Sequence, residues 1–283
     1  MDLNPPTERF AGLARELLNG REPELGEAAL MLAAELAESP APEALDGARQ
    51  ELRRLGELVA RRTESIAPGD TPERVAGLIS TLHGECGFHG NHADYQNPRN
   101  SFLPDVLERR TGIPITLAIV YIEVARGAGL PLRGVSFPQH FLVRAEGPRP
   151  LVLDPFFGTL LNEAECTRRL RNALGDSAEL DEQALRPATV REILVRMLSN
   201  LKNVYLGSQQ WVRIIDCIDR ILLLAPEQIG ERRDRGLIWE RLECPIPAVA
   251  DLERYLEEAP AAPEGRALRE RIARLKPRAS ALH

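Results

Sequence analysis

His140 and Asp154 are the residues of this 283-residue chain whose types and spacing best suit catalysis. His140 lies in the segment PQHFLVR and Asp154 in LVLDPFFG, each on or at the end of a predicted strand. If these strands are antiparallel neighbours, the Asp154 carboxylate can fix the tautomer and orientation of the His140 ring, which is half of a nucleophilic triad. A structural hydrogen bond at a strand end is the simpler interpretation of the same spacing.

A triad would also need a nucleophile, for which the sequence offers Thr116 and Cys86. The helix expected to face His140 begins TGIPIT, residues 111–116, and contains no cysteine. Thr116 is the nearest hydroxyl, but a threonine in a first turn more simply bonds to the backbone. Cys86 follows a predicted helix, where the negative end of the helix dipole would raise the pKa of its thiol and make it a poor nucleophile.

Four potential metal ligands follow one another at intervals of three residues: His83, Cys86, His89 and His92. One helical turn can bring two such ligands to one face, but Gly87 and Gly90 interrupt any continuous helix here. We therefore expect ordinary loop residues and no metal site. The chain also lacks the GxxxxGK[ST], GxGxxG, GxSxG and HExxH patterns, so no cofactor is expected.

The elements that must position His140 and Asp154 form an α+β unit in the middle of the chain. A polar loop over residues 91–100 precedes an apolar helix over residues 113–125, and Pro114 opens this helix where a missing N–H costs little. Strands are predicted over residues 132–137, 140–144 and 150–153, separated by Pro138 and by a turn at residues 146–148. A buried helix followed by an antiparallel meander is typical of an α+β fold.

Residues 5–87 are predicted to form an all-helical layer. Apolar residues recur at intervals of three and four over residues 25–36, 45–59 and 71–82, and prolines and glycines separate these segments. Aromatic residues are nearly absent, so we expect closely spaced helices that pack through leucine and alanine.

The last third of the chain contains an internal repeat with a period of 34 residues. A shift by this number matches eight similar positions: Val204 with Ile238, Tyr205 with Trp239, Val212 with Ile246, Ile218 with Leu252, Ile221 with Tyr255, Leu222 with Leu256, Ala225 with Ala259, and Pro226 with Pro260. The same period is typical of tetratricopeptide helix pairs. Residues 265–276 are expected to form a helix that caps the stack.

The composition excludes several classes of partner. The 42 acidic and 36 basic side chains give a net charge of −6, so no nucleic-acid partner is expected. Arginine runs such as Arg168, Arg169 and Arg171 are typical of solvated helix faces. The longest apolar stretch, residues 113–122, is shorter than the roughly 20 residues that cross a bilayer, so no membrane partner is expected either. Four scattered cysteines favour a reducing compartment, and we expect a cytoplasmic protein.

Several phrases together resemble the bacterial SirB-one family, which pairs a transglutaminase-like core with C-terminal tetratricopeptide repeats. These phrases are NPRNSFL, GIPITL, HFLVR and LDPF, within a match from about Phe88 to Pro260. The expected fold class is α+β and mostly helical. It combines a helical N-terminal layer (1–87), the small antiparallel sheet of a transglutaminase-like, papain-like core (88–187) and C-terminal tetratricopeptide helix pairs (188–283).

The resemblance also assigns places to the chemical groups. In active cores of this type, a cysteine in a GxC segment opens the central helix, a later strand supplies a histidine, and the next strand supplies an aspartate. Here the matching positions hold Pro114, His140 and Asp154. Because a pyrrolidine carbon cannot attack a carbonyl, we expect a triad remnant without a nucleophile. Five further residues are candidates for lining the cleft: Asn97, Arg99, Asn100, Thr116 and Gln139.

We therefore expect a non-catalytic scaffold that binds a protein or peptide through its degenerate cleft and its repeat groove. The alternative is a cysteine- or threonine-dependent amide hydrolase or acyltransferase that uses His140 and Asp154 with Cys86 or Thr116. A third hypothesis is a metal-dependent activity at the group of residues from His83 to His92.

Overall fold

The computed structural model describes residues 3–37, 42–146 and 151–280. Its backbone contacts divide the chain into two compact units. The larger unit extends from Asn19 to Met197, and the smaller unit joins the chain up to Leu18 to the residues from Leu198 onward. The domain boundaries proposed from the sequence, at residues 87 and 187, stay predictions.

The larger unit begins with three helices close to the predicted segments: α2 (Leu25–Leu36), α3 (Pro42–Arg62) and α4 (Thr71–Ile79). The predicted third helix continues beyond α4 as a π-helical segment, η1 (Ser80–Glu85), and Cys86 follows its last residue. After β1 (His89–Gly90) come a short 3-10 helix, η2 (Pro98–Ser101), and α5 (Leu103–Arg109). The sequence patterns did not predict α5.

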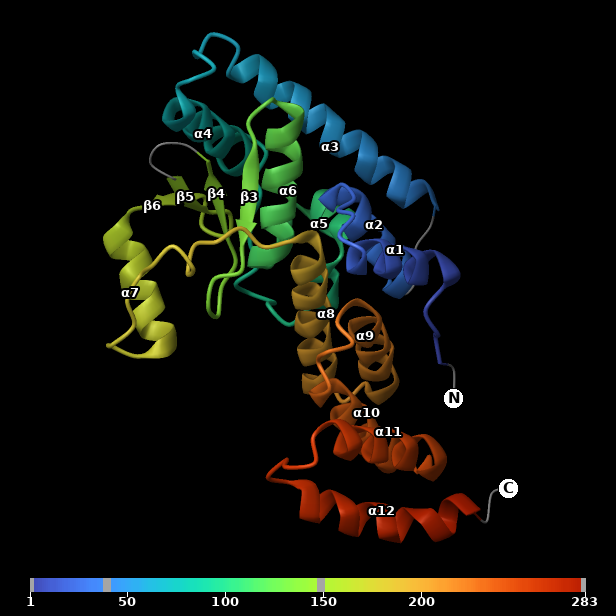
Figure 1. Cartoon of the computed structure of the whole chain (residues 1–283). Coiled ribbons are helices and arrows are strands. Elements are labelled where there is room, and N and C mark those ends of the chain that lie inside the picture. Colours follow the sequence, from blue (N-terminus) through green and yellow to red (C-terminus); the bar gives the residue numbers. More distant parts are fainter. Residues whose placement is uncertain (1–2, 38–41, 147–150, 281–283) are drawn as a thin grey trace. The chain divides into compact units, whose positions relative to one another are not determined.

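Helix α6 (Pro114–Gly127) forms the centre of this unit (Figure 1). Every residue from Pro114 to Ala125 is buried, because the helix packs against α3 and α5 and also against two strands, β3 and β4. Two glycines allow α3 and α6 to approach closely. A Cβ atom added to Gly56 would lie 3.2 Å from the Cα atom of Gly127. This close crossing joins α3 to a helix outside residues 5–87 and is made through glycine, so the expected packing of the N-terminal helices through leucine and alanine stays a prediction.

The sheet is an antiparallel meander in the order β3-β4-β5-β6. Its strands are β3 (Leu132–Val135), β4 (Leu142–Ala145), β5 (Leu151–Asp154) and β6 (Thr159–Leu161). Three strands were predicted, and β6 was not. The predicted start of the second strand at His140 was wrong: residues 136–141 form a turn, in which Gln139 has a φ of 57° and the His140 N–H donates to the carbonyl of Phe137. Part of the predicted turn at residues 146–148, and Pro150, lie outside the described residues.

Helix α7 (Glu163–Leu174) packs on the sheet through the buried residues Cys166 and Leu170. These side chains share one apolar cluster with Phe137, Leu142 and Val152. This packing fixes α7 beside the turn that carries His140, so other residues of the helix are held near that turn.

The smaller unit contains the repeats. It comprises the end of α8 (Val190–Gly207), then α9 (Trp211–Leu224), α10 (Gly230–Arg241), α11 (Pro245–Glu258) and α12 (Gly265–Ser280), which is the expected capping helix. The backbone conformation repeats with the same period of 34 residues. Gln209 and Glu243 occupy equivalent turns and have φ values of 55° and 57°. In each turn the next amide donates over 2.9 Å to the carbonyl of Tyr205 or Trp239. The predicted helix pairs are confirmed.

The first helix, α1 (Glu8–Leu18), packs on α9 in this same unit. The N–H of Asn4 donates to Oδ1 of Asp216 over 3.2 Å, and Nη1 of Arg220 donates to the carbonyl of Asn4 over 2.6 Å. Asp216 and Arg220 are both buried. Backbone groups of the N-terminal segment therefore help to satisfy two charged side chains inside the repeat unit. Among the described helices, none is both long and apolar enough to span a membrane.

Candidate functional site

The structure brings His140 and Asp154 together. Asp154 is the last residue of β5, and His140 lies two residues before β4, which pairs with β5 in antiparallel register. Nε2 of His140 lies 3.0 Å from Oδ2 of Asp154. The imidazole and the carboxylate therefore have the geometry of the histidine–aspartate half of a triad.

The Asp154 carboxylate is fully buried and has several donors. Its Oδ1 accepts the N–H of Phe156 over 3.0 Å, and its Oδ2 also accepts a hydrogen bond from Nη1 of Arg169 on α7. Burial alone would raise the pKa of this carboxyl. The hydrogen bonds from His140 and Arg169, together with the Arg169 charge, outweigh burial and hold the pKa below its usual range. Asp154 is therefore an anion at neutral pH.

The ring of His140 has one nitrogen committed to Asp154 and one available. Because the carboxylate accepts the Nε2–H, the neutral ring carries its lone pair on Nδ1. Within the described chain, Nδ1 has no hydrogen-bond partner. The ring stacks on Phe157, with centroids 6.4 Å apart, and meets the edge of Phe156 at 6.1 Å. The imidazole therefore packs between two aromatic rings.

Neither predicted nucleophile is bonded to His140. The hydroxyl of Thr116 is buried at the start of α6, donates to the carbonyl of Asn100 over 2.6 Å and accepts the N–H of Ile113 over 3.2 Å. Pro114 is the first residue of the same helix and is buried. Burial raises the pKa of the Cys86 thiol, and the cations that oppose this effect are Arg110 and Arg54, not His140. Among the described residues, no sulfur or hydroxyl forms a hydrogen bond with the His140 ring.

The four candidate metal ligands between His83 and His92 do not form a cluster. Nδ1 of His83 bonds to the carbonyl of Phe88 over 2.8 Å, and Nδ1 of His89 bonds to the carbonyl of Gly87 over 2.7 Å. The ring of His92 instead packs against Phe156. In the part of the chain that the structure describes, no three His, Cys, Asp or Glu side chains form a group that could hold a metal ion.

Four of the five candidate cleft residues lie in the polar loop before α5 or at the start of α6. The side chain of Asn97 accepts the N–H of Arg99 over 2.9 Å, and Arg99 forms ion pairs with Asp105 and Glu108. Asn100 is fully buried, and its side-chain amide donates to the carbonyl of Asp94 over 2.7 Å. These contacts hold the loop together. Thr116, described above, joins this loop to α6.

The fifth candidate, Gln139, lies beside His140 and lines a small cavity of about 200 Å³. Arg169 and Asn172 of α7 also line this cavity, as does Phe157. None of these three residues was predicted to line the site, and the expectation that Arg169 lies on a solvated helix face was wrong, because it bonds to the buried Asp154. The spacing of three between Arg169 and Asn172 places them on one helical face, but α7 itself was not predicted.

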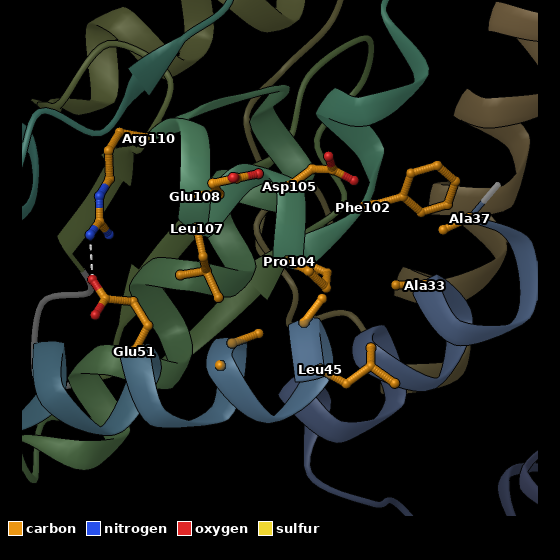
Figure 2. Close-up of a pocket in the computed structure, with 13 residues that line it drawn as sticks. Ala33, Ala37, Leu45, Glu51, Phe102, Pro104, Asp105, Leu107, Glu108 and Arg110 are labelled. Carbon is orange, nitrogen blue, oxygen red and sulfur yellow. Dashed lines mark hydrogen bonds and ion pairs between the residues drawn. The ribbon is translucent and has the colours of Figure 1, made fainter. Parts of the chain in front are cut away.

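Larger cavities lie elsewhere in the described chain, and none of the three, of about 440, 880 and 300 Å³, includes His140 or Asp154. The first, of about 440 Å³, lies between α2, α3 and α5 (Figure 2). Leu107 and Pro104 point toward α3, and the ion pair of Arg110 with Glu51 closes one end. The second, of about 880 Å³, lies between the sheet, α7 and residues 180–187. We place the candidate site at His140, because its ring has a nitrogen without a hydrogen-bond partner among the described residues and lines a cavity.

Comparisons with known proteins agree with this architecture. A family model described as the transglutaminase-like superfamily matches residues 47–199, and one described as tetratricopeptide repeat matches residues 201–273. A UPF0162 protein of Xylella fastidiosa (strain Temecula1) is 47% identical over 194 residues, which cover 67% of this chain and 69% of the relative. The UPF0162 protein PA3419 of Pseudomonas aeruginosa is 34% identical over 263 residues, covering 92% of this chain and 94% of the relative.

The UPF0162 protein YchA of Escherichia coli (strain K12) is 30% identical over 235 residues, which cover 82% of this chain and 87% of the relative. No solved structure matches the chain.

Proposed function

The chain belongs to the bacterial UPF0162 family, with a transglutaminase-like region followed by tetratricopeptide repeats, and from this premise we propose that it is a non-catalytic protein-binding scaffold. It would hold a peptide segment of its partner in the cleft at His140 and another segment on the repeats. Tetratricopeptide repeats generally mediate protein interactions, which supports the second part of this proposal. We also propose that the chain is a member of the SirB-one family and that it is located in the cytoplasm.

One observation carries the proposal: the imidazole and carboxylate of a triad are retained without a third partner. His140 is held by Asp154, but no sulfur or hydroxyl of the described residues bonds to its ring. Pro114 begins the helix where the family resemblance places the cysteine. Without a nucleophile the covalent route of acyl transfer has no first step. The retained pair would then serve to shape the cleft.

The first test asks whether the protein turns over an amide. Purified protein and a His140→Ala variant are incubated with a glutamine-containing peptide, and released ammonia and cleaved products are measured. An electrophilic probe such as iodoacetamide is added in parallel, and the intact mass is recorded. We expect no turnover and no adduct that depends on His140. Hydrolysis or stoichiometric labelling that disappears in the His140→Ala variant would instead support the hydrolase alternative.

The second test asks whether the repeats recruit a partner. Leu206 and Ile246 are large apolar residues of the repeat unit that are 52% and 40% exposed. We expect a Leu206→Asp, Ile246→Asp double variant to lose the proteins that co-purify with the intact chain. Leu18→Asp, at an equally exposed position on α1, is the matched control and should retain them. If both variants retain the same proteins, the apolar surface at Leu206 and Ile246 recruits nothing.

A further inference from the structure

We propose that the cavity beside His140 is a carboxylate-binding site, which receives either the C-terminal carboxylate or an Asp or Glu side chain of a bound peptide. This inference rests on the proposed function, because it names the chemistry of the ligand that the same cleft would hold. Three observations support it. Hydrogen-bond donors on α7 have no partner among the described residues, both oxygens of Asp154 already accept hydrogen bonds, and the cavity has a suitable size.

The donors come from two side chains on one face of α7. Arg169 uses only Nη1 in its hydrogen bond with Asp154, so within the described chain its Nε and Nη2 donors have no partner. Asn172, one turn further along, is exposed, and its amide has no hydrogen-bond partner among the described residues. Both residues line the cavity. A planar guanidinium with donors to spare matches the planar carboxylate group.

Among the described residues, Asp154 is the carboxylate that bonds to Arg169, and it does not compete for the remaining donors. Asp154 is fully buried, and both of its oxygens already accept hydrogen bonds, Oδ1 from Phe156 and Oδ2 from His140 and Arg169. It therefore anchors Arg169 without presenting an acceptor to the cavity. The same buried anion disfavours a doubly charged phosphate, because one guanidinium cannot balance three negative charges at close range.

The size and walls of the cavity fit a carboxylate on a short apolar stem. Its volume is about 200 Å³, and Pro138, Phe157 and Ala173 supply apolar walls. Phe157 is 45% exposed, so its ring offers surface to the peptide beyond the cavity. The amide of Gln139 donates to the carbonyl of Ala173 over 3.2 Å and ties the His140 turn to the end of α7.

The test uses two pairs of small probes at constant pH and ionic strength. N-acetyl-dialanine and its C-terminal amide represent a peptide C-terminus. N-acetyl-glutamate N-methylamide and the corresponding glutamine compound represent an internal side chain. The readout is the ring resonance of His140 in protein labelled at its five histidines, assigned with a His140→Gln variant. We expect the His140 resonance to shift in a saturable way with at least one acid. The Kd of the corresponding amide should be at least ten times larger.

The variants separate the binding role of the donors from their structural role. Asn172→Asp adds a negative charge to the cavity one turn from Arg169, where it can pair with the free donors of that side chain, and should weaken binding of the acid at least tenfold. Arg169→Gln should do the same. Arg168→Gln, at an exposed position next to it in sequence, is the matched control and should bind like wild type.

Three outcomes would overturn the inference: equal responses to acid and amide, no saturable shift with any probe, or an Asn172→Asp variant that binds the acid like wild type. None of these decides the proposed function, which fails only if turnover depends on His140 or if the repeats recruit nothing. The acid whose binding saturates shows whether the ligand is a C-terminal carboxylate or an Asp or Glu side chain.

Discussion

Asp154 shows how a single buried charge can support the site. Its carboxylate has no exposed surface, yet it connects the turn of His140, the loop at Phe156 and helix α7 through three hydrogen-bond donors. Removing one member of a buried ion pair leaves the other without compensation, which costs more than the pair itself contributes. The stability of the larger unit should therefore depend on the ionisation of this group.

We expect Asp154→Asn to lower the free energy of unfolding by about 3 kcal/mol near pH 7. The folded-state pKa of Asp154 is lowered, so its contribution is fully present above the unfolded pKa of about 3.9 and is lost as pH falls through the folded value. Urea unfolding between pH 3 and 7 measures the difference, which should shrink below about pH 4. Asp176→Asn, at an exposed position, should show no difference; a loss at Asp154 that is independent of pH would contradict the prediction.

Cys86 is expected to behave as an ordinary shielded thiol. Because burial raises the pKa of this thiol, iodoacetamide at pH 7.5 should modify Cys86 more slowly than it modifies a cysteine in a short peptide. The rate should be the same in a His140→Ala variant, since no hydrogen bond joins the two residues. Mass spectrometry of the modified peptide gives the rate, and unfolding in urea should increase it. A fast reaction that slows in His140→Ala would identify Cys86 as an activated nucleophile.

The residues of the site differ in how far the sequence could predict them. His140 and Asp154 stand in recognisable segments at the ends of strands, so their proximity followed from antiparallel pairing. Arg169 could not be distinguished from Arg168 and Arg171, because its role depends on which face of α7 meets the sheet. Phe157 and Asn172 have common residue types, and only the folded chain brings them to the same cavity.

At the scale of elements, apolar patterns and the 34-residue repeat predicted most helices, but neither signal predicted α5 or α7. Helix α7 is largely polar, but its start carries a capping box: Asn162 accepts the N–H of Glu165, and the Glu165 carboxylate accepts the N–H of Asn162. The pattern of an asparagine followed three residues later by a glutamate was visible in the sequence. The π-helical segment after α4 has no such signal, because the apolar spacing of residues 71–82 does not distinguish a rare π-helical turn from a continued α-helix.

The crossing of α3 and α6 gives a prediction for an element pair. Replacing either Gly56 or Gly47 of α3 with alanine raises helix propensity, which alone favours the folded state by about 1 kcal/mol. At Gly56 the added Cβ would lie 3.2 Å from the backbone of Gly127, whereas at Gly47 nothing lies within 4 Å. We expect Gly56→Ala to be less stable than Gly47→Ala by about 2 kcal/mol in urea unfolding, because overpacking forces the helices apart. Equal stabilisation by both changes would mean that the helices separate without cost.

At the scale of the whole molecule, the repeat unit takes in a segment that is distant in sequence. Regular spacing identified the helix pairs, because each repeat carries the same caps and the same turns. No periodicity linked α1 to α9, because helix contacts and the hydrogen bonds of the Asn4 backbone to Asp216 and Arg220 join residues about 200 positions apart in the chain. Long-range contacts of this kind lie beyond the reach of local patterns.

This association predicts a selective effect of shortening the N-terminus. A chain that begins at Thr7 would lose the backbone groups of Asn4 that bond to Asp216 and Arg220, both of which are buried. Hydrogen bonds to charged groups are worth about 1.5–3 kcal/mol each, so we expect α9 to lose about 2 kcal/mol of protection in native-state hydrogen exchange. The amides of α6, in the other compact unit, serve as the internal control and should keep their protection. An equal loss in both helices would show that the two units unfold as one, and no loss in α9 would show that the N-terminal segment does not stabilise the repeats.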